Sequence, residues 1–128
     1  MDRLKRRADF LAAAKGARVQ AAPFLVQARD RRDRKELRVG LTVTKKIGKA
    51  VERNRIRRRL RAAADAVLPH TGRPGFDYVL VARRAALNAP FDAILADLER
   101  AVARLHAARK TGRSPARPGK RGDGDADE

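Results

Sequence analysis

One cationic segment, residues 45–61, carries most of the side chains that could do chemistry. Nine of its seventeen residues are lysine or arginine, and its only acidic residue is Glu52. An apolar row at helical spacing runs through the segment and beyond it: Ile56, Leu60, Ala63 and Val67. These four residues project from one narrow side of a helix, so the segment can bury that side in a core and keep its cations in water.

The opposite side of this predicted helix is polar and cationic, with Arg55 and Arg59 on a flank. It consists of Asn54, Arg57, Arg58 and Arg61. Guanidinium groups offer forked donors that suit closely spaced phosphates. A helix whose charges serve only solubility has both acidic and basic residues on its surface. In this helix only Glu52 and Asp65 are acidic and can balance the charge of the arginines. The pattern therefore favours RNA binding, with affinity that falls steeply as salt rises. Asn54 either bonds a 2′-OH or base edge, or bonds a neighbouring protein group.

Composition supports a polyanionic partner and excludes several other classes. The 128 residues suit one domain plus tails, and the net charge is +17. Nucleic acid is the leading partner and an anionic membrane surface the second. The chain has no cysteine, which excludes disulfides and thiolate metal sites. No apolar run approaches the roughly 18 residues of a membrane span, and the charged start is unlike a secretory signal. We therefore expect a cytoplasmic protein.

The residues of a self-sufficient enzyme are mostly missing. His70 and His106 are far apart in the sequence, and the one serine, Ser114, lies near the end of the chain. No zinc-ligand spacing and no phosphate-binding glycine loop is present. The acidic residues stand singly among arginines, where they balance charge.

Two runs before the cationic segment predict strands. Residues 37–44 alternate between apolar and polar positions, which is the clearest strand pattern in the chain, and residues 24–28 form a second strand. We expect an antiparallel hairpin of these strands, joined by a charged turn at residues 30–36. Gly40 on the polar side either leaves room for a close approach to the backbone or forms an ordinary bulge.

The remaining elements follow from periodicity and caps. A short helix should run from an N-cap at Asp9 to Gly16, and the cationic helix should end before Pro69. Residues 76–82 predict an interior strand that completes a βαβ unit with a parallel pair. A last helix has an apolar stripe: Phe91, Ile94, Leu95, Leu98, Val102 and Leu105. Phe10 serves either as a core anchor or as an aromatic shelf for an unpaired base.

We accordingly divide the chain into three parts. Residues 1–8 form a basic N-terminal arm, residues 9–107 an RNA-binding α+β domain, and residues 108–128 a disordered charged tail that begins basic and ends acidic.

The segment from Leu37 to Arg58 closely resembles the signature of the bacterial ribonuclease P protein subunit. That signature joins a strand ending in R-V-G-x-x-V-x-K-K to a helix beginning A-V-x-R-N-R-I-[KR]-R. Weaker similarity extends from Leu4 to Leu105. The resemblance implies an α+β fold with about four strands, three helices and a left-handed crossover. Strand, helix and strand alone would predict a right-handed connection.

The resemblance also implies a role. Proteins of this family bind the catalytic RNA of ribonuclease P and assist removal of the 5′ leader from precursor tRNA. The RNA, with Mg²⁺ bound mainly by the RNA, performs the hydrolysis, and neither a protein partner nor a membrane is required.

Site residues carry over from the family's motif positions. Those implied to bind the RNA subunit are Lys45, Lys46, Lys49, Arg53, Asn54, Arg57, Arg58 and Arg61. Those implied to bind the leader are Phe10, Leu25, Gln27 and Arg83. The family often has a second aromatic residue at the position of Ala14 and a tyrosine near Gln27. We therefore expect leader binding that depends more on charge and on Leu25, with a weaker base preference.

Two other readings compete with this one. A ribosomal or other structural RNA-binding protein would bind RNA without any part in cleavage. A nuclease acting alone would cut RNA without an RNA subunit.

Overall fold

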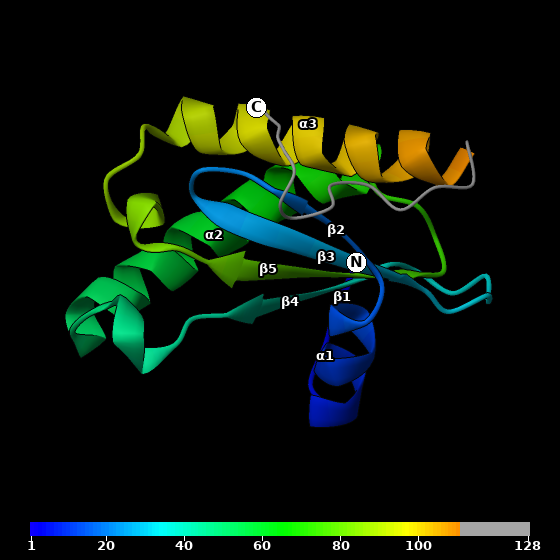
Figure 1. The fold of residues 1–128 in the computed structure, drawn as a ribbon, viewed down its shortest axis with the longest axis horizontal. Helices are drawn as coiled ribbons and strands as arrows, with labels where there is room; N and C mark the ends of the chain where they lie inside the picture. The colour runs from blue at the N-terminus through cyan, green and yellow to red at the C-terminus, as the bar shows by residue number, and fades with distance from the viewer. Residues whose placement is uncertain (111–128) are drawn as a thin grey trace.

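The structure is a computed structural model that describes the backbone of residues 1–110 and the side chains of residues 1–107. Five strands form one sheet in the order β1-β4-β5-β3-β2 (Figure 1). The strands are β1 (Asp2–Arg3), β2 (Ala17–Gln20), β3 (Phe24–Asp30), β4 (Arg38–Thr42) and β5 (Phe76–Ala82). The α-helices are α1 (Arg7–Ala14), α2 (Ala50–Thr71) and α3 (Phe91–Lys110), with two 3₁₀ turns, η1 (Lys45–Ile47) and η2 (Arg84–Leu87).

The α+β class and the three helices are confirmed, but the sheet has five strands where the resemblance implied about four. The sequence patterns predicted three of the five strands, and the two that they missed are the short β1 and β2. β1 has two residues and β2 has four, so neither is long enough to show a clear alternating pattern.

The central strand, β5, determines the order of the sheet. It pairs in parallel with β4 and antiparallel with β3, so the predicted hairpin between β3 and β4 is wrong. Six of the seven β5 residues are buried, including residues on both of its faces. β3 and β4, which carry more polar residues on one face, lie on either side of β5. The βαβ unit with a parallel pair is confirmed, because α2 connects β4 to β5.

Helices α2 and α3 cover one face of the sheet, and α1 lies on the other (Figure 1). The predicted apolar row of α2 is fully in the core, with Ile56, Leu60 and Ala63 completely buried. Most of the α3 stripe is also buried from Ile94 onward, with Leu95 only partly buried, whereas Phe91 at its start is 37% exposed. The main core therefore lies between the sheet and these two helices.

Helix boundaries differ from the expectations at two places. α1 begins at Arg7 rather than after Asp9, and residues 1–8, expected to form an arm, contribute β1 and the buried Leu4. α2 continues through Pro69 to Thr71. A proline leaves the carbonyl four residues earlier without its helical donor, and that carbonyl belongs to the exposed Asp65, where water can bond it. The tail was predicted to begin at residue 108, but α3 continues to Lys110. Residues 111–128 of the predicted tail lie outside the described residues.

Strand register divides the α1 side of the sheet into three rows. Each row has one residue from β4, β5 and β3: Arg38, Asp77 and Arg29; Gly40, Val79 and Gln27; Thr42, Val81 and Leu25. Helix α1 covers the first two rows, through Asp9 and Phe10. The third row is only half-buried, so it is the open part of this face.

The first row holds a buried carboxylate. Asp77 is 0% exposed, and it accepts hydrogen bonds from Arg38 (Nε, 2.8 Å) and Arg31 (Nη1, 2.5 Å). Burial alone would raise the pKa of Asp77, but the bonds from Arg38 and Arg31 outweigh it and lower the pKa below its usual value. Asp9 of α1 faces Arg38 and Arg29 at 3.6 and 3.9 Å, which ties the helix to this row.

We predict that Asp77→Asn destabilises the fold by about 2–4 kcal/mol, because it leaves the partly buried guanidinium groups of Arg31 and Arg38 without their carboxylate. The control is Asp97→Asn, which removes a pair with Arg100 on the surface of α3 and should cost about 0.5 kcal/mol. Urea unfolding of the two variants measures both values. Equal effects would show that the Asp77 network does not hold the sheet together.

Candidate nucleic-acid interface

The N-terminus of α2 is fixed by one carboxylate. Glu52 Oε1 accepts the backbone N–H of Lys49 at 3.0 Å, and both its oxygens accept bonds from Arg84 of η2 at 2.9 Å. Arg84 also bonds the carbonyl of Ile47 at 2.8 Å. A Cβ at Gly48 would meet the ends of the Glu52 and Arg84 side chains, so these two side chains would have to shift from their present positions.

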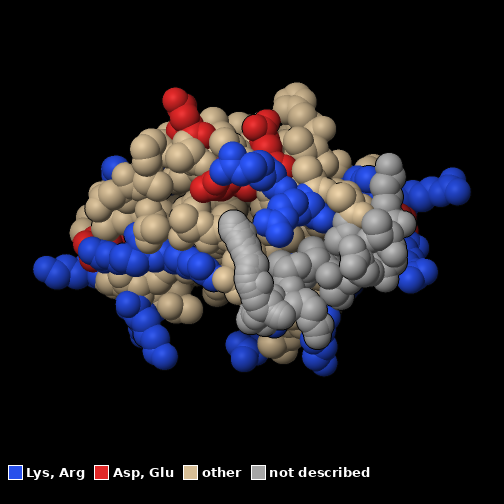
Figure 2. Space-filling model, turned by 45° about the horizontal axis from the view of Figure 1, so that its top comes forward, with Lys and Arg blue, Asp and Glu red and all other residues tan. Residues whose placement is uncertain are grey.

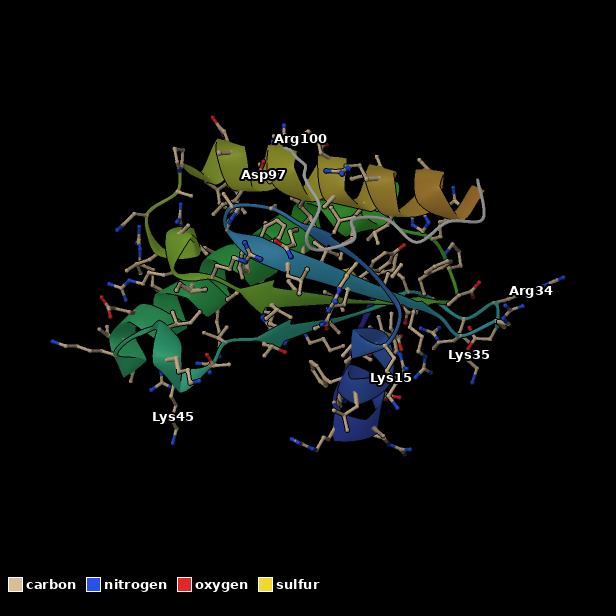
Figure 3. The ribbon with its side chains drawn as sticks, in the orientation of Figure 1. Lys15, Arg34, Lys35, Lys45, Asp97 and Arg100 are labelled. Carbon is tan, nitrogen blue, oxygen red and sulfur yellow. The ribbon has the colours of Figure 1, made fainter. Side chains whose placement is uncertain are left out.

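This junction positions the first group of predicted RNA ligands. Lys45 and Lys46 on η1, and Lys49 at the N-cap of α2, are all exposed. Lys45 projects away from the body of the protein (Figure 3). Arg53 is half-buried and donates from Nε to the carbonyl of Gly48 at 3.2 Å. It therefore supports the junction as well as contributing charge.

The outer face of α2 holds the second group. Asn54 Oδ1 accepts a hydrogen bond from Arg57 Nη1 at 3.0 Å, so at least one role of this amide is to orient a neighbouring guanidinium. Arg58 is exposed, and Arg61 is half-buried beside a cavity. The structure thus brings the predicted RNA-subunit ligands onto η1 and one continuous face of α2.

Two arginines of the cationic segment have a different role. Arg55 Nε donates to the carbonyl of Leu87 at 3.0 Å, and Arg59 donates to the carbonyls of Ala86, Leu87 and Ala89. Burial, and secondarily the charge of Arg55, lowers the pKa of Arg59. These side chains fasten η2 to α2. The sequence placed them on a flank of the helix but gave no signal that backbone carbonyls would receive them.

The predicted leader residues lie on the α1 side of the sheet, but in different rows. Phe10 packs with Leu4, Ala13 and Val79, and its ring occupies the space that a side chain at Gly40 would need. Gly40 pairs in register with Val79, so it permits a close approach and is not a bulge. Phe10 is therefore an anchor of this small apolar cluster that keeps part of its surface exposed.

The other three leader residues differ in accessibility. Gln27 is 9% exposed, because it lies in the second row that α1 covers. Leu25 lies in the open third row. Arg83 is exposed just past β5 and donates from Nη1 to the carbonyl of Ala21 at 3.3 Å. The open surface thus comprises Leu25, Arg83 and the exposed part of Phe10.

Lysine and arginine also appear on the rest of the surface. Figure 2 shows them spread over the visible face, with acidic groups among them toward the top of the view, and Figure 3 shows Arg34 and Lys35 at the end of the sheet far from Lys45. Within residues 1–107, no group of His, Cys, Asp or Glu side chains is arranged to hold a metal ion. No described helix has the length and apolar character to cross a membrane.

Fold and site together define a small α+β protein whose cationic helix connects two parallel strands. Residues 1–106 match the sequence family described as Ribonuclease P. The chain is 51% identical over 107 residues to the ribonuclease P protein component of Ruegeria pomeroyi, covering 81% of this chain and 86% of that protein. It is 46% identical over 116 residues to the same component of Paramagnetospirillum magneticum, covering 87% of each.

Solved structures agree with this assignment. The Staphylococcus aureus RNase P protein superposes with a TM-score of 0.66 at 30% identity, covering 80% of this chain and 94% of that one. The Thermotoga maritima RNase P protein gives a TM-score of 0.64 at 27% identity, covering 78% and 97%. The chain belongs to the ribonuclease P protein family.

We predict that Glu52 stabilises the α2 junction in a pH-dependent way. The hydrogen bonds from Arg84 and from Lys49 lower the pKa of Glu52 from 4.5 to about 2. Its stabilising effect is therefore complete above pH 4.5 and is lost as the pH falls toward about 2. Unfolding of wild type and Glu52→Gln between pH 6 and 2.5 should show a difference that shrinks with acid. A constant difference would contradict this role.

Proposed function

We propose that this chain is the protein subunit of the ribonuclease P ribonucleoprotein and binds its catalytic RNA through η1 and the outer face of α2. The observation that carries the proposal is the division of the cations. Arg59 is half-buried and donates to carbonyls of the protein, and the exposed Arg55 also donates to one, whereas Lys45, Lys49 and Arg58 are exposed and their side chains donate to no carbonyl among the described residues. Exposed cations on η1, at the N-cap of α2 and along its outer face suit the phosphates of a folded RNA.

In this proposal the RNA performs the chemistry. The catalytic RNA, with Mg²⁺ bound mainly by the RNA, hydrolyses the phosphodiester bond that joins the leader to precursor tRNA. The protein neutralises phosphates and positions both RNAs. It acts in the cytoplasm and requires no membrane and no further protein. Family membership supports this division of labour.

The leader would lie on the open part of the α1 side of the sheet. Leu25 and the exposed part of Phe10 supply apolar contact, and Arg83 supplies charge. Base stacking on an aromatic ring contributes roughly 1–3 kcal/mol per base. Because Ala14 and Gln27 replace aromatic residues, the leader should be held with little base preference.

The decisive experiment adds the purified protein to the catalytic RNA at low Mg²⁺ and measures 5′ processing of precursor tRNA. We expect a faster rate, and we expect Arg57→Ala, Arg58→Ala and Arg61→Ala together to weaken assembly and flatten its log–log salt dependence by about 2–3. The matched control removes three exposed cations elsewhere: Arg73, Arg100 and Arg104. It should leave the slope nearly unchanged.

Other outcomes would favour other functions. An unchanged processing rate with tight binding to ribosomal RNA would indicate a structural RNA-binding protein. Cleavage by protein free of RNA would indicate a nuclease acting alone. An unaltered salt slope in the α2 variant would place the interface elsewhere on the protein.

Leader binding gives a separate prediction. The ratio of the affinity for precursor tRNA to the affinity for mature tRNA should vary little when the leader sequence is changed. Phe10→Ala should lower this ratio by about five- to tenfold. Lys15→Ala, an exposed change at the end of α1, serves as the control. A strong preference for one base that survives Phe10→Ala would contradict this account of leader binding.

A further inference from the structure

A cavity of about 210 Å³ lies at the outer edge of β4, where β1, α1 and α2 meet. Apolar groups line part of it, among them Leu4, Phe10 and Ala64. Arg61 and Asp65, one helical turn apart on α2, line it as well. Drug-sized ligands need roughly 300–1,000 Å³, so this space suits a single heterocycle.

The cavity exists because β1 is short. β1 pairs only with Arg38 and Val39, and its last bond to β4 runs from the N–H of Leu4 to the carbonyl of Val39. β4 continues to Thr42. β1 therefore covers only the beginning of the β4 edge and leaves Leu41 without a neighbouring strand on that side. Phe10 over Gly40 closes the side toward α1.

Asp65 is the unusual member of this cavity. Glu52, the other acid that interrupts the cationic part of α2, is bonded to Arg84 and Lys49. The Asp65 side chain is exposed, and its carboxylate makes no ion pair or hydrogen bond with any residue that the structure describes. A carboxylate on a helix that binds phosphates would repel them. It can only accept hydrogen bonds, so its natural ligand is a donor.

We propose that this cavity binds one unpaired guanine of the catalytic RNA. Guanine presents two adjacent donors, N1–H and the N2 amino group, which the two oxygens of Asp65 can accept together. Its O6 acceptor then faces the donors of Arg61. Uracil, by contrast, presents a single N–H between two acceptors, and adenine and cytosine present only an amino donor on that edge. Unpaired RNA bases are recognised in this way, by their Watson–Crick edges.

The inference rests on the proposed binding of the catalytic RNA to α2. Arg61 lines the cavity and belongs to the same cationic face as Arg57 and Arg58. A nucleotide whose phosphate is bound by these arginines would therefore lie next to the cavity. Of the open leader surface only Phe10 borders this cavity, because Leu25 is on β3 and β5 separates β3 from β4. Arg61 and Asp65 lie on α2, the helix proposed to bind the catalytic RNA, so we assign the guanine to that RNA and not to the leader.

The sign of one charge change tests the proposal. Removing an acid from a protein of net charge +17 should leave its affinity for RNA unchanged or raise it. We predict that Asp65→Asn instead lowers the affinity for the catalytic RNA by about five- to tenfold. Glu99→Gln, an exposed acid on α3, is the matched control and should not lower it. Unchanged or higher affinity of Asp65→Asn would overturn the proposal.

Chemical protection identifies the base. Kethoxal modifies unpaired guanine at N1 and N2, the atoms assigned to Asp65, so bound wild-type protein should protect one guanine of the catalytic RNA. The Asp65→Asn protein, at a saturating concentration, should leave that guanine reactive while other protections persist. Identical protection by both proteins would refute the site. A wild-type protein that fails to bind the catalytic RNA at all would refute the proposed function instead.

Discussion

The buried carboxylate of Asp77 is the point at which three strands and the first helix converge. It lies on the central strand and bonds Arg38 of β4 and Arg31 at the end of β3, and Asp9 of α1 faces the same cluster. A lone buried carboxylate would be costly, and paired guanidinium groups make it tolerable. Because α1 is held at this row, the third row of the sheet stays open.

The arginine guanidinium group serves two purposes in this protein, a structural one and a binding one, and the partner of each group determines which purpose it serves. Arg31, Arg55 and Arg59 are satisfied by carboxylates or carbonyls of the fold. Arg58 and the lysines near it are exposed. Internal acids and carbonyls thus select which cations remain available to a polyanion. The composition gives the total charge, but the division between structural and available cations depends on tertiary contacts.

The sequence predicted the elements whose patterns are long. The apolar positions of the alternation in β4, of the row of α2 and of the stripe of α3 all pack in or against the main core, apart from Phe91. The strand order could not be read in this way, because pairing of β3 and β4 with β5 depends on contacts distant in sequence. In the site, the motif located the exposed cations, whereas the carbonyl contacts of Arg59 and the cavity beside Asp65 emerge only in three dimensions.

The central position of β5 has a consequence for synthesis of the chain. β3 and β4 each depend on β5 for their main pairing, yet β5 is the last strand to leave the ribosome. Until residue 82 emerges, β3 lacks its main partner and α2 lacks the finished sheet beneath it. Non-local pairing of this kind slows folding and leaves apolar surface accessible in the nascent chain. The order of the strands thereby makes completion of the fold a late event in translation.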